Sequence, residues 1–215
     1  MAVTDPAQKL TVYGYDTENN LVGITDAASH ETGFAYDALG RVTPVTFPSS
    51  LTESYTYDAM NNLLGKTDRN SHTINYAYDA PYRLTGKTYP NSTAVNYTYD
   101  ALNHLTQVAD PSGNYSFTYD NLGRLTGTST QYAFLSGQTL SNSYTYDPGS
   151  NRASLTNPQG GVTSYTYDNN GNRLSKTDST GTTSYTWDYE NPLTSLTVPG
   201  TGTIRVEYDP FGRRI

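Results

Sequence analysis

An alternation of aromatic and small residues, with a period of two, recurs along the whole chain. In nine of the ten copies an aromatic residue, a small residue, a second aromatic residue and an aspartate follow one another, as in Phe117-Thr118-Tyr119-Asp120, and the last copy begins with Val206-Glu207 instead. This alternation places both rings on one face of an extended strand, and aromatic and Thr residues suit a pleated surface. The pattern therefore predicts a β-strand at each copy, and no stretch of the chain has the period of a helix.

The step from an aromatic residue to Asp recurs at nearly constant intervals. Successive steps lie 21, 21, 21, 21, 20, 27, 21, 20 and 21 residues apart. A period of this length is typical of a stack of identical supersecondary units. We predict a single domain over residues 1–215, with about ten repeats of about 21 residues and one longer repeat around residues 120–146. The steps are Tyr15-Asp16, Tyr36-Asp37, Tyr57-Asp58, Tyr78-Asp79, Tyr99-Asp100, Tyr119-Asp120, Tyr146-Asp147, Tyr167-Asp168, Trp187-Asp188 and Tyr208-Asp209.

A turn follows each of these strands. Three residues after the Asp, eight of the ten copies carry Gly or Asn, which tolerate positive φ. This combination predicts a type I turn followed by a left-handed residue, which closes a hairpin with a bulge, while the Asp carboxylate accepts hydrogen bonds from the turn amides. The sequence thus predicts an all-β repeat array of about ten antiparallel hairpins in one continuous, curved or coiled sheet. The glycines of these turns are Gly40, Gly123, Gly171 and Gly212.

The returning strand contains two further recurring residue types. A glycine recurs two residues after the leucine of this strand, as at Gly65 and Gly127, and we expect it to leave room for a neighbouring ring to lie flat. An arginine recurs after the left-handed turn residue, as at Arg41 and Arg124, and we expect it to pair with the motif Asp of a neighbouring repeat.

Composition decides between a folded and a disordered chain. Leu, Ile, Val and Phe make up only 36 of the 215 residues, a share typical of disorder. However, 16 of the 21 tyrosines occupy two fixed repeat positions, and a tyrosine ring supplies apolar area for packing. The net charge is only −7, so repulsion within the chain is weak. We therefore predict a folded array with its rings as the packing layer.

Several classes of protein are disfavoured. The chain has no Cys, which rules out disulfides and thiolate chemistry, and no apolar run long enough to span a membrane. Its start lacks the pattern of a signal peptide. The acidic balance and the 13 scattered Lys and Arg residues argue against nucleic acid as a partner. We expect no cofactor.

Four copies of the motif carry a family resemblance. Residues 36–42 (YDALGRV), 119–125 (YDNLGRL), 167–174 (YDNNGNRL) and 208–215 (YDPFGRRI) resemble the YD repeats of Rhs toxins, of the C components of insecticidal toxin complexes and of teneurins. The resemblance covers the chain from about Leu10 to Ile215. It implies a segment of a hollow shell or barrel of paired hairpins that encloses a toxin polypeptide or mediates surface interactions, without catalysis.

The expected location and partners follow. We expect a secreted or cell-surface protein of bacterial type. Because an open sheet leaves backbone donors and acceptors of its first and last hairpins unpaired, we predict that its partners are copies of itself or adjacent YD repeats of a longer chain. The chain departs from the family in two ways. It has few repeats, and it lacks the family's core segment with Asp-Pro-x-Gly motifs. In the family, that core segment acts as an aspartic self-protease. Asp209-Pro210-Phe211-Gly212 has these letters but lies in a repeat turn, so we expect no self-cleavage.

Other candidate chemistry has a structural explanation. Motif aspartates in successive hairpins are expected about 10 Å apart, too far for paired-carboxylate catalysis, and they offer too few oxygens for a calcium ladder. His30, His72 and His104 lack metal-ligand spacing and are expected at surface turns. An alternative function is a surface adhesion module that binds glycans through its aromatic rows. The long interval near residues 131–137 predicts an elongated hairpin or a surface loop, or alternatively a lid or contact loop with a function of its own.

Overall fold

The computed structural model describes residues 1–209 and 211–215. The chain divides into two compact units, Met1–Tyr97 and Thr98–Ile215. Pro210, part of the Asp-Pro-x-Gly segment discussed above, lies outside the described residues. All regular elements of the described residues are β-strands, and none of these residues belongs to a helix that could cross a membrane.

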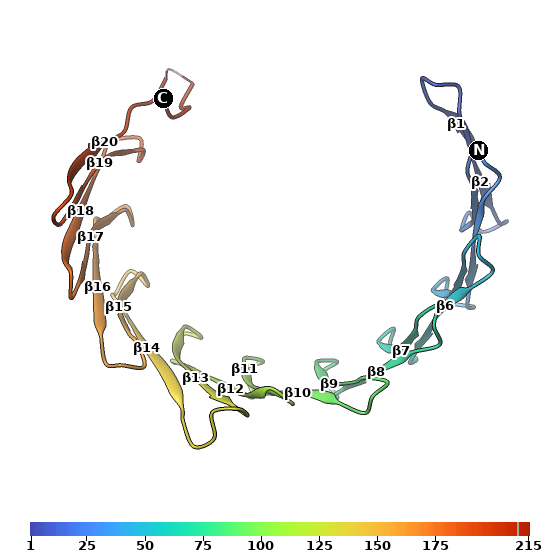
Figure 1. Ribbon diagram of the computed structural model, residues 1–215, viewed down its shortest axis with the longest axis horizontal. Coiled ribbons are helices and arrows are strands. Elements are labelled where there is room, and N and C mark those ends of the chain that lie inside the picture. The colour runs from blue at the N-terminus through green and yellow to red at the C-terminus, as the bar shows by residue number, and fades with distance from the viewer. Residues whose placement is uncertain (210) are drawn as a thin grey trace. The chain divides into compact units, whose positions relative to one another are not determined.

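In the first unit, each strand pairs antiparallel with its neighbour in the chain (Figure 1). The prediction of antiparallel hairpins is therefore confirmed here. The strands are β1 (Ala2–Thr4), β2 (Leu10–Tyr15), β3 (Leu21–Thr25), β4 (Glu31–Tyr36), β5 (Val42–Thr46), β6 (Thr52–Tyr57), β7 (Leu63–Thr67), β8 (Thr73–Tyr78), β9 (Leu84–Thr88) and β10 (Ala94–Tyr99), the last of which continues into the second unit.

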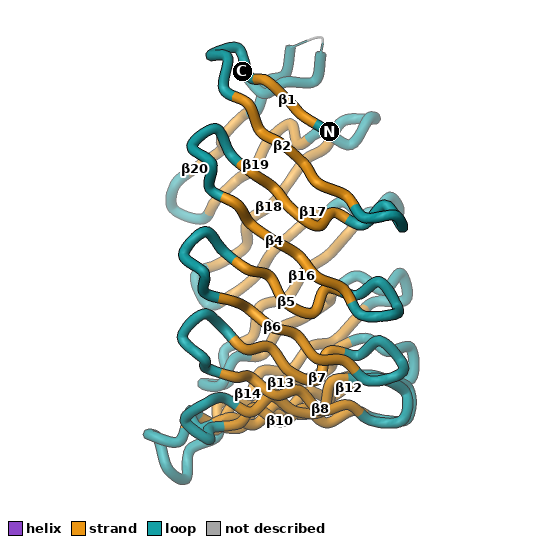
Figure 2. Tube along the Cα trace, turned by 90° about the vertical axis from the view of Figure 1, so that its right-hand side faces the viewer, coloured by secondary structure: helices purple, strands orange, loops and turns teal. Residues whose placement is uncertain are grey.

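The second unit repeats the same arrangement from β11 to β20. In Figure 2 tilted strands alternate with turns at both of their ends. The strands are β11 (Leu105–Asp110), β12 (Gly113–Tyr119), β13 (Leu125–Tyr132), β14 (Leu140–Tyr146), β15 (Arg152–Thr156), β16 (Val162–Tyr167), β17 (Arg173–Asp178), β18 (Gly181–Trp187), β19 (Leu193–Val198) and β20 (Gly202–Arg205).

The turns that begin at a motif Asp lie in a row at one end of the strands of each sheet. We call this row of turns the YD edge, as distinct from the edge strands that end a sheet. Asp58 shows their geometry: its amide donates to the carbonyl of Asn62 at 3.0 Å, and its Oδ1 accepts the amides of Met60 and Asn62 at 2.8 and 2.9 Å. The third residue after the Asp is left-handed in all ten turns, and the register shifts beside them as expected for a bulge. The predicted turn is confirmed.

The turns at the opposite edge, the return edge, mostly use the same geometry. Ser29 and Ser71 have φ of 63°, and the Oδ1 atoms of Asp26 and Asp68 accept the amides two and four residues later. In the sequence, these two turns appear as an Asp followed by two variable residues and a Ser. Serine tolerates the left-handed conformation less readily than Gly or Asn, so the pattern is easily overlooked.

The two faces of each sheet differ in chemistry. One face carries the motif rings, and the other carries hydroxyls that bond across strands, such as Thr145 to Ser154 at 2.7 Å and Thr166 to Ser175 at 2.7 Å. Among the described residues Val206 is the only buried apolar side chain, so the rings remain half-exposed in a single layer.

The expectation that strand glycines make room for rings is wrong. Gly65 is paired with Thr56 and Gly127 with Thr118, both on the hydroxyl face. A Cβ at either glycine would lie 2.8 Å from the threonine Oγ1. A threonine hydroxyl, and not a ring, therefore lies over these glycines, and later repeats fill the same position with Ser154 and Ser175, which bond to the threonine.

Candidate functional site

Neighbouring hairpins separate from one another toward the YD edge, and we call this gap the seam. Strands β5 and β6 show it: their backbones pair only from Pro44↔Ser54 to Thr46↔Thr52, next to the return turn. Closer to the YD edge the ladder stops. There the hydroxyl of Tyr57 donates to the carbonyl of Val42 at 3.1 Å. The motif tyrosine therefore takes over where the backbone ladder ends.

This seam hydrogen bond recurs in both units. In each case the acceptor is the carbonyl of the first residue of a strand that follows a YD turn. The hydroxyl bonds are Tyr36 to Leu21 (2.8 Å), Tyr119 to Leu105 (2.9 Å), Tyr146 to Leu125 (2.7 Å) and Tyr167 to Arg152 (3.1 Å). At the copy where Trp187 replaces Tyr, its indole Nε1 donates to the carbonyl of Arg173 at 2.8 Å.

Arginine adds a second bridge across the seam. The Nε of Arg41 donates to Asp37 Oδ2 at 2.7 Å, while its Nη1 donates to the carbonyl of Asp58 at 2.7 Å and to Asn61 Oδ1 at 3.0 Å. Its guanidinium lies 4.7 Å from the ring centroid of Tyr57. The expectation of a pair with the neighbouring carboxylate is wrong, because the arginine pairs with the Asp of its own repeat. It reaches the next repeat through the backbone carbonyl of Asp58 and the side chain of Asn61.

The same bridge recurs in the second unit. Arg124 donates to Asp120 Oδ2 at 2.7 Å and to Ser150 Oγ at 3.1 Å, and it lies 4.6 Å from the ring centroid of Tyr146. Each arginine thus joins two successive YD turns and covers the motif ring between them.

The hydrogen bonds in the YD turns favour the ionised form of the Asp carboxylates, which accept these bonds. The pKa of Asp37 is lowered chiefly by the backbone amide of Arg41, with its side chain contributing further. The pKa of Asp58 is lowered chiefly by the side-chain amide of Asn62. These carboxylates are therefore ionised at neutral pH and cap the turn, and a group held in this state makes a poor proton donor.

The three histidines lie in separate turns, each beside the Asp four residues earlier. The Nδ1 of His30 lies 3.0 Å from Asp26 Oδ2, and that of His104 lies 2.9 Å from Asp100 Oδ2. His104 also stacks on Tyr119, with ring centroids 4.7 Å apart. Histidine here occupies the place that Arg or Asn fills in other turns. In the described part of the chain no three His, Asp or Glu side chains gather as a metal site.

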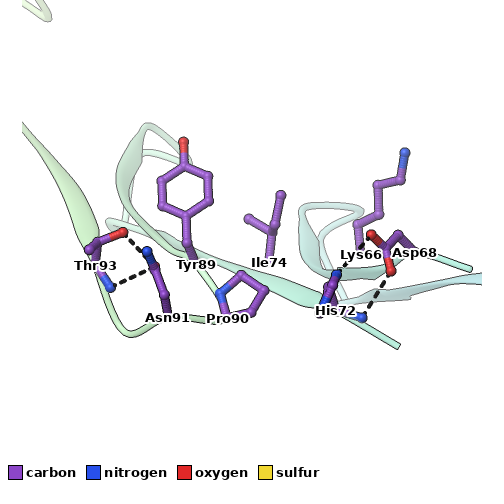
Figure 3. Close-up of a pocket in the computed structure, with 8 residues that line it drawn as sticks. All are labelled: Lys66, Asp68, His72, Ile74, Tyr89, Pro90, Asn91 and Thr93. Carbon is purple, nitrogen blue, oxygen red and sulfur yellow. Dashed lines mark hydrogen bonds and ion pairs between the residues drawn. The ribbon is translucent and has the colours of Figure 1, made fainter. Parts of the chain in front are cut away.

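A groove of about 640 Å³ lies between two return turns of the first unit (Figure 3). Tyr89, Ile74 and Lys66 stand along it in the figure. The polar groups at its ends serve the turns: Asp68 Oδ1 accepts the amide of His72 at 2.9 Å, and Asn91 Oδ1 accepts the hydroxyl of Thr93 at 2.7 Å. The lining residues are Lys66, Asp68, His72, Ile74, Tyr89, Pro90, Asn91 and Thr93.

A second groove, of about 340 Å³, lies between the first two return turns of the chain, with Asp5 and Asp26 in its lining. The grooves therefore follow from the spacing of the return turns. They do not single out one repeat as a site.

Cations cover many rings of the aromatic face. The guanidinium of Arg152 lies 4.5 Å from the ring centroid of Tyr144, and that of Arg173 lies 4.7 Å from that of Tyr165. A sugar that stacks on an aromatic ring needs a free ring face. The aromatic rows thus offer a sugar less free ring surface than their number suggests.

A sheet of repeated hairpins, each closed at a Tyr-Asp step, places the chain in the class of YD-repeat proteins. The family model described as Teneurin YD-shell matches residues 1–115, and the one described as RHS Repeat matches residues 99–133 and 146–183. The first match spans more than half of the chain, which therefore belongs to the teneurin YD-shell family. The resemblance stated from the sequence is confirmed.

Solved toxin complexes share the fold. The chain matches TcdB2-TccC3 without its hypervariable C-terminal region at 20% identity and a TM-score of 0.60, over 96% of this chain and 13% of that chain. It matches the Tc holotoxin pore of Photorhabdus luminescens at 18% identity and a TM-score of 0.56, over 96% and 13% of the two chains. The chain thus spans about an eighth of the length of these toxin chains. No curated protein matches its sequence.

Proposed function

We propose that the chain is a non-catalytic structural module that contributes hairpins to a hollow YD-repeat shell around a toxin polypeptide. The observation that carries this proposal is the recurrence of the seam. Hydrogen bonds of the same kind join successive hairpins in both units. A seam that recurs along the array suits a wall that is extended by adding hairpins, whereas an active site needs one repeat to differ from the others.

Self-association is the second part of the proposal. Strand β1 pairs with β2, and β20 pairs with β19, each through one of its sides. The other side of an edge strand offers backbone donors and acceptors to any further strand. In a shell, these edges would pair with adjacent repeats of a longer chain or with copies of this one.

Light scattering over a range of concentrations tests the self-association. We expect the mass to rise with concentration, and a charge placed on the edge strands to reduce it. Suitable variants are Val3→Lys in β1 and Ile204→Lys in β20, since these side chains are 48% and 45% exposed. Leu39→Lys, at an exposed turn tip, is the matched control and should leave assembly unchanged. A monomer at every concentration would overturn this part of the proposal.

Containment is tested separately with a disordered polypeptide fused after Ile215. We expect the assembled fusion to protect this polypeptide from added protease, and the double variant Val3→Lys with Ile204→Lys to leave it exposed. Assembly without protection would refute enclosure while leaving self-association intact. We further propose that the shell lies outside the cell, as part of a secreted or surface-bound bacterial-type protein, and that it takes no cofactor. Prolonged incubation of the purified chain should yield no self-cleavage product.

A further inference from the structure

The seam between the YD turns at Asp147 and Asp168 lacks the arginine that bridges other seams. In the seam after Asp37, the guanidinium of Arg41 lies 4.7 Å from the centroid of the next motif ring. It also donates at 2.7 Å to Asp37 and at 2.7 Å to a carbonyl of the next YD turn. The corresponding residue after Asp147 is Asn151. Among the described residues, the Asn151 Nδ2 donates only to the carboxylate of Asp147, 3.1 Å from its Oδ2.

The arginine of this repeat stands one position later and covers a different ring. Arg152 lies 4.5 Å from the ring centroid of Tyr144, which belongs to its own hairpin. Tyr57 and Tyr146 are instead covered by the arginine of the preceding repeat. Within the described residues, the motif ring of the next repeat, Tyr167, therefore lacks this cover. Its hydroxyl still donates to the carbonyl of Arg152 at 3.1 Å, so the seam itself is intact.

A groove of about 470 Å³ lies at this place, between the two YD turns. Its lining includes Asp147, Asn151, Tyr167 and Asp168. Gly171, the left-handed residue of the second turn, also lines it. In the two arginine-bridged seams described above, this turn position holds an Asn or a Ser that accepts a bond from the guanidinium. Glycine at this position leaves the groove open to a ligand.

The groove is acidic. The pKa of Asp147 is lowered chiefly by the side-chain amide of Asn151, and that of Asp168 chiefly by the side-chain amide of Asn172. Both carboxylates are therefore ionised at neutral pH. The carbonyl of Asp168 accepts the amide of Gly171 at 3.1 Å and has a second lone pair for another donor. None of the described residues in the lining is Lys, Arg or His.

We propose that this groove binds the side chain of an arginine that belongs to another polypeptide. The guanidinium takes the place that Arg41 and Arg124 fill in their own seams. It lies over the ring of Tyr167, beside the carboxylate of Asp147 and against the carbonyl of Asp168. A lysine ammonium lacks the planar fork that meets a carboxylate and a carbonyl together.

The surroundings of the groove favour an arginine within a chain over free arginine. Free arginine brings its own carboxylate toward Asp147 and Asp168, and the described lining offers it no cation. In a polypeptide this carboxylate is replaced by a neutral amide. The proposal concerns ligand binding at one seam, so it does not depend on assembly or enclosure.

Saturation-transfer difference NMR with acetyl-Gly-Arg-Gly-amide tests the proposal, because it detects weak ligands of monomeric and assembled proteins alike. We expect saturable signals on the arginine side-chain protons. The same peptide with lysine or citrulline in place of arginine should bind about fivefold more weakly, since lysine loses the fork and citrulline loses the charge. Free arginine should also bind more weakly than the peptide.

Asn151→Arg restores within the chain the arginine of the other seams. It should fill the groove and weaken peptide binding about tenfold. The matched control, Asn121→Arg, adds the same charge at an exposed turn tip and should leave binding unchanged. Arg41→Asn makes the opposite change in the first unit and should create a second site, with a larger signal at saturation.

Circular dichroism of each variant separates lost binding from lost folding. No binding of the arginine peptide, or equal binding by the wild type and Asn151→Arg, would overturn the proposal. Equal binding of the arginine, lysine and citrulline peptides would do the same, and tighter binding of free arginine would refute a polypeptide partner. If Asn151→Arg does not fold, Arg41→Asn decides the question, and no added signal from that variant contradicts the proposal.

Discussion

The YD edge and the return edge close their hairpins in similar ways but connect them differently. Asp58 at the YD edge and Asp68 at the return edge both accept the amides two and four residues later. At the YD edge, side chains also bond across to the next hairpin, as Tyr57 and Arg41 do. At the return edge, neighbouring turns leave the open grooves described above, with Arg69 lying over Phe47 of the preceding turn, while a groove of about 470 Å³ also lies between the YD turns at Asp147 and Asp168.

The difference shows that closing a hairpin and joining hairpins are separate tasks. At each edge the two strands joined by a turn pair up to that turn, whereas strands between neighbouring turns separate, as β5 and β6 do toward the YD edge and β8 and β9 do toward the return edge. Toward the YD edge, a side-chain donor reaches the carbonyl that this separation leaves unpaired. The aspartate thus shapes the turn, and the aromatic residue before it joins the repeats.

Acid should destabilise the fold more than any single substitution, because it protonates the turn aspartates of both the YD edge and the return edge. The folded-state pKa values of Asp37 and Asp58 at the YD edge, and of Asp26 and Asp68 at the return edge, are all lowered. Their contribution to stability is present above the unfolded pKa, about 3.9, and is lost as pH falls through the lower folded values. Circular dichroism across an acid titration should therefore show unfolding below about pH 4. A fold unchanged by that titration would contradict the capping role.

Removing seam hydroxyls should weaken the array strongly. The triple variant Tyr36→Phe, Tyr57→Phe and Tyr146→Phe keeps the rings but leaves three carbonyls without their donors. At about 1 kcal/mol for each hydrogen bond, urea denaturation should give a loss of about 3 kcal/mol in the free energy of unfolding. The matched control removes hydroxyls that donate no bond to the described residues, at Tyr13, Tyr76 and Tyr144. An equal loss in both triple variants would show that the seam bond is unimportant.

Trp187 allows a test of the donor alone. Trp187→Tyr keeps a polar donor on the ring, whereas Trp187→Phe removes it from the carbonyl of Arg173. We expect Trp187→Phe to lower the free energy of unfolding by about 1 kcal/mol more than Trp187→Tyr does. If the two variants are equally stable, ring packing and not hydrogen bonding accounts for the role of this position.

The smallest effect should be the difference between aspartates at the two edges. Asp58→Ala and Asp68→Ala each remove an acceptor for two turn amides. Their melting temperatures should therefore fall by similar amounts. A much larger fall for Asp58→Ala would mean that the YD turn also supports the seam through its carboxylate, which the present geometry assigns to the tyrosine and the arginine.

The hairpins and YD turns could be predicted from the sequence because their signals are local. Alternation gives the strands, and Gly or Asn three residues after Asp gives the left-handed turn. The seam could not be predicted in the same way, since its acceptors are backbone carbonyls, which leave no mark on residue type. The partners of Arg41 and the threonine over Gly65 depend on register between strands, which local patterns do not specify.

One signal for the seam was nevertheless available. The motif slot before Asp holds nine Tyr and one Trp and never Phe, whereas the slot two residues earlier accepts Phe34, Phe117 and Val206. A position that takes Tyr or Trp but not Phe requires a polar donor as well as a ring. The position directly before Asp therefore needs a ring that carries a hydrogen-bond donor. The position two residues earlier needs only an apolar side chain of sufficient size.

Because the seam bond ends on a carbonyl, it makes no demand on the side chain of the residue that accepts it. Leu21, Val42 and Arg152 all serve as acceptors. A repeat copied or exchanged by recombination would therefore fit beside almost any other repeat without compensating mutations. Arrays of this kind can change length by unequal crossing-over while each new junction remains hydrogen-bonded, which gives such genes an easy route to larger or smaller products.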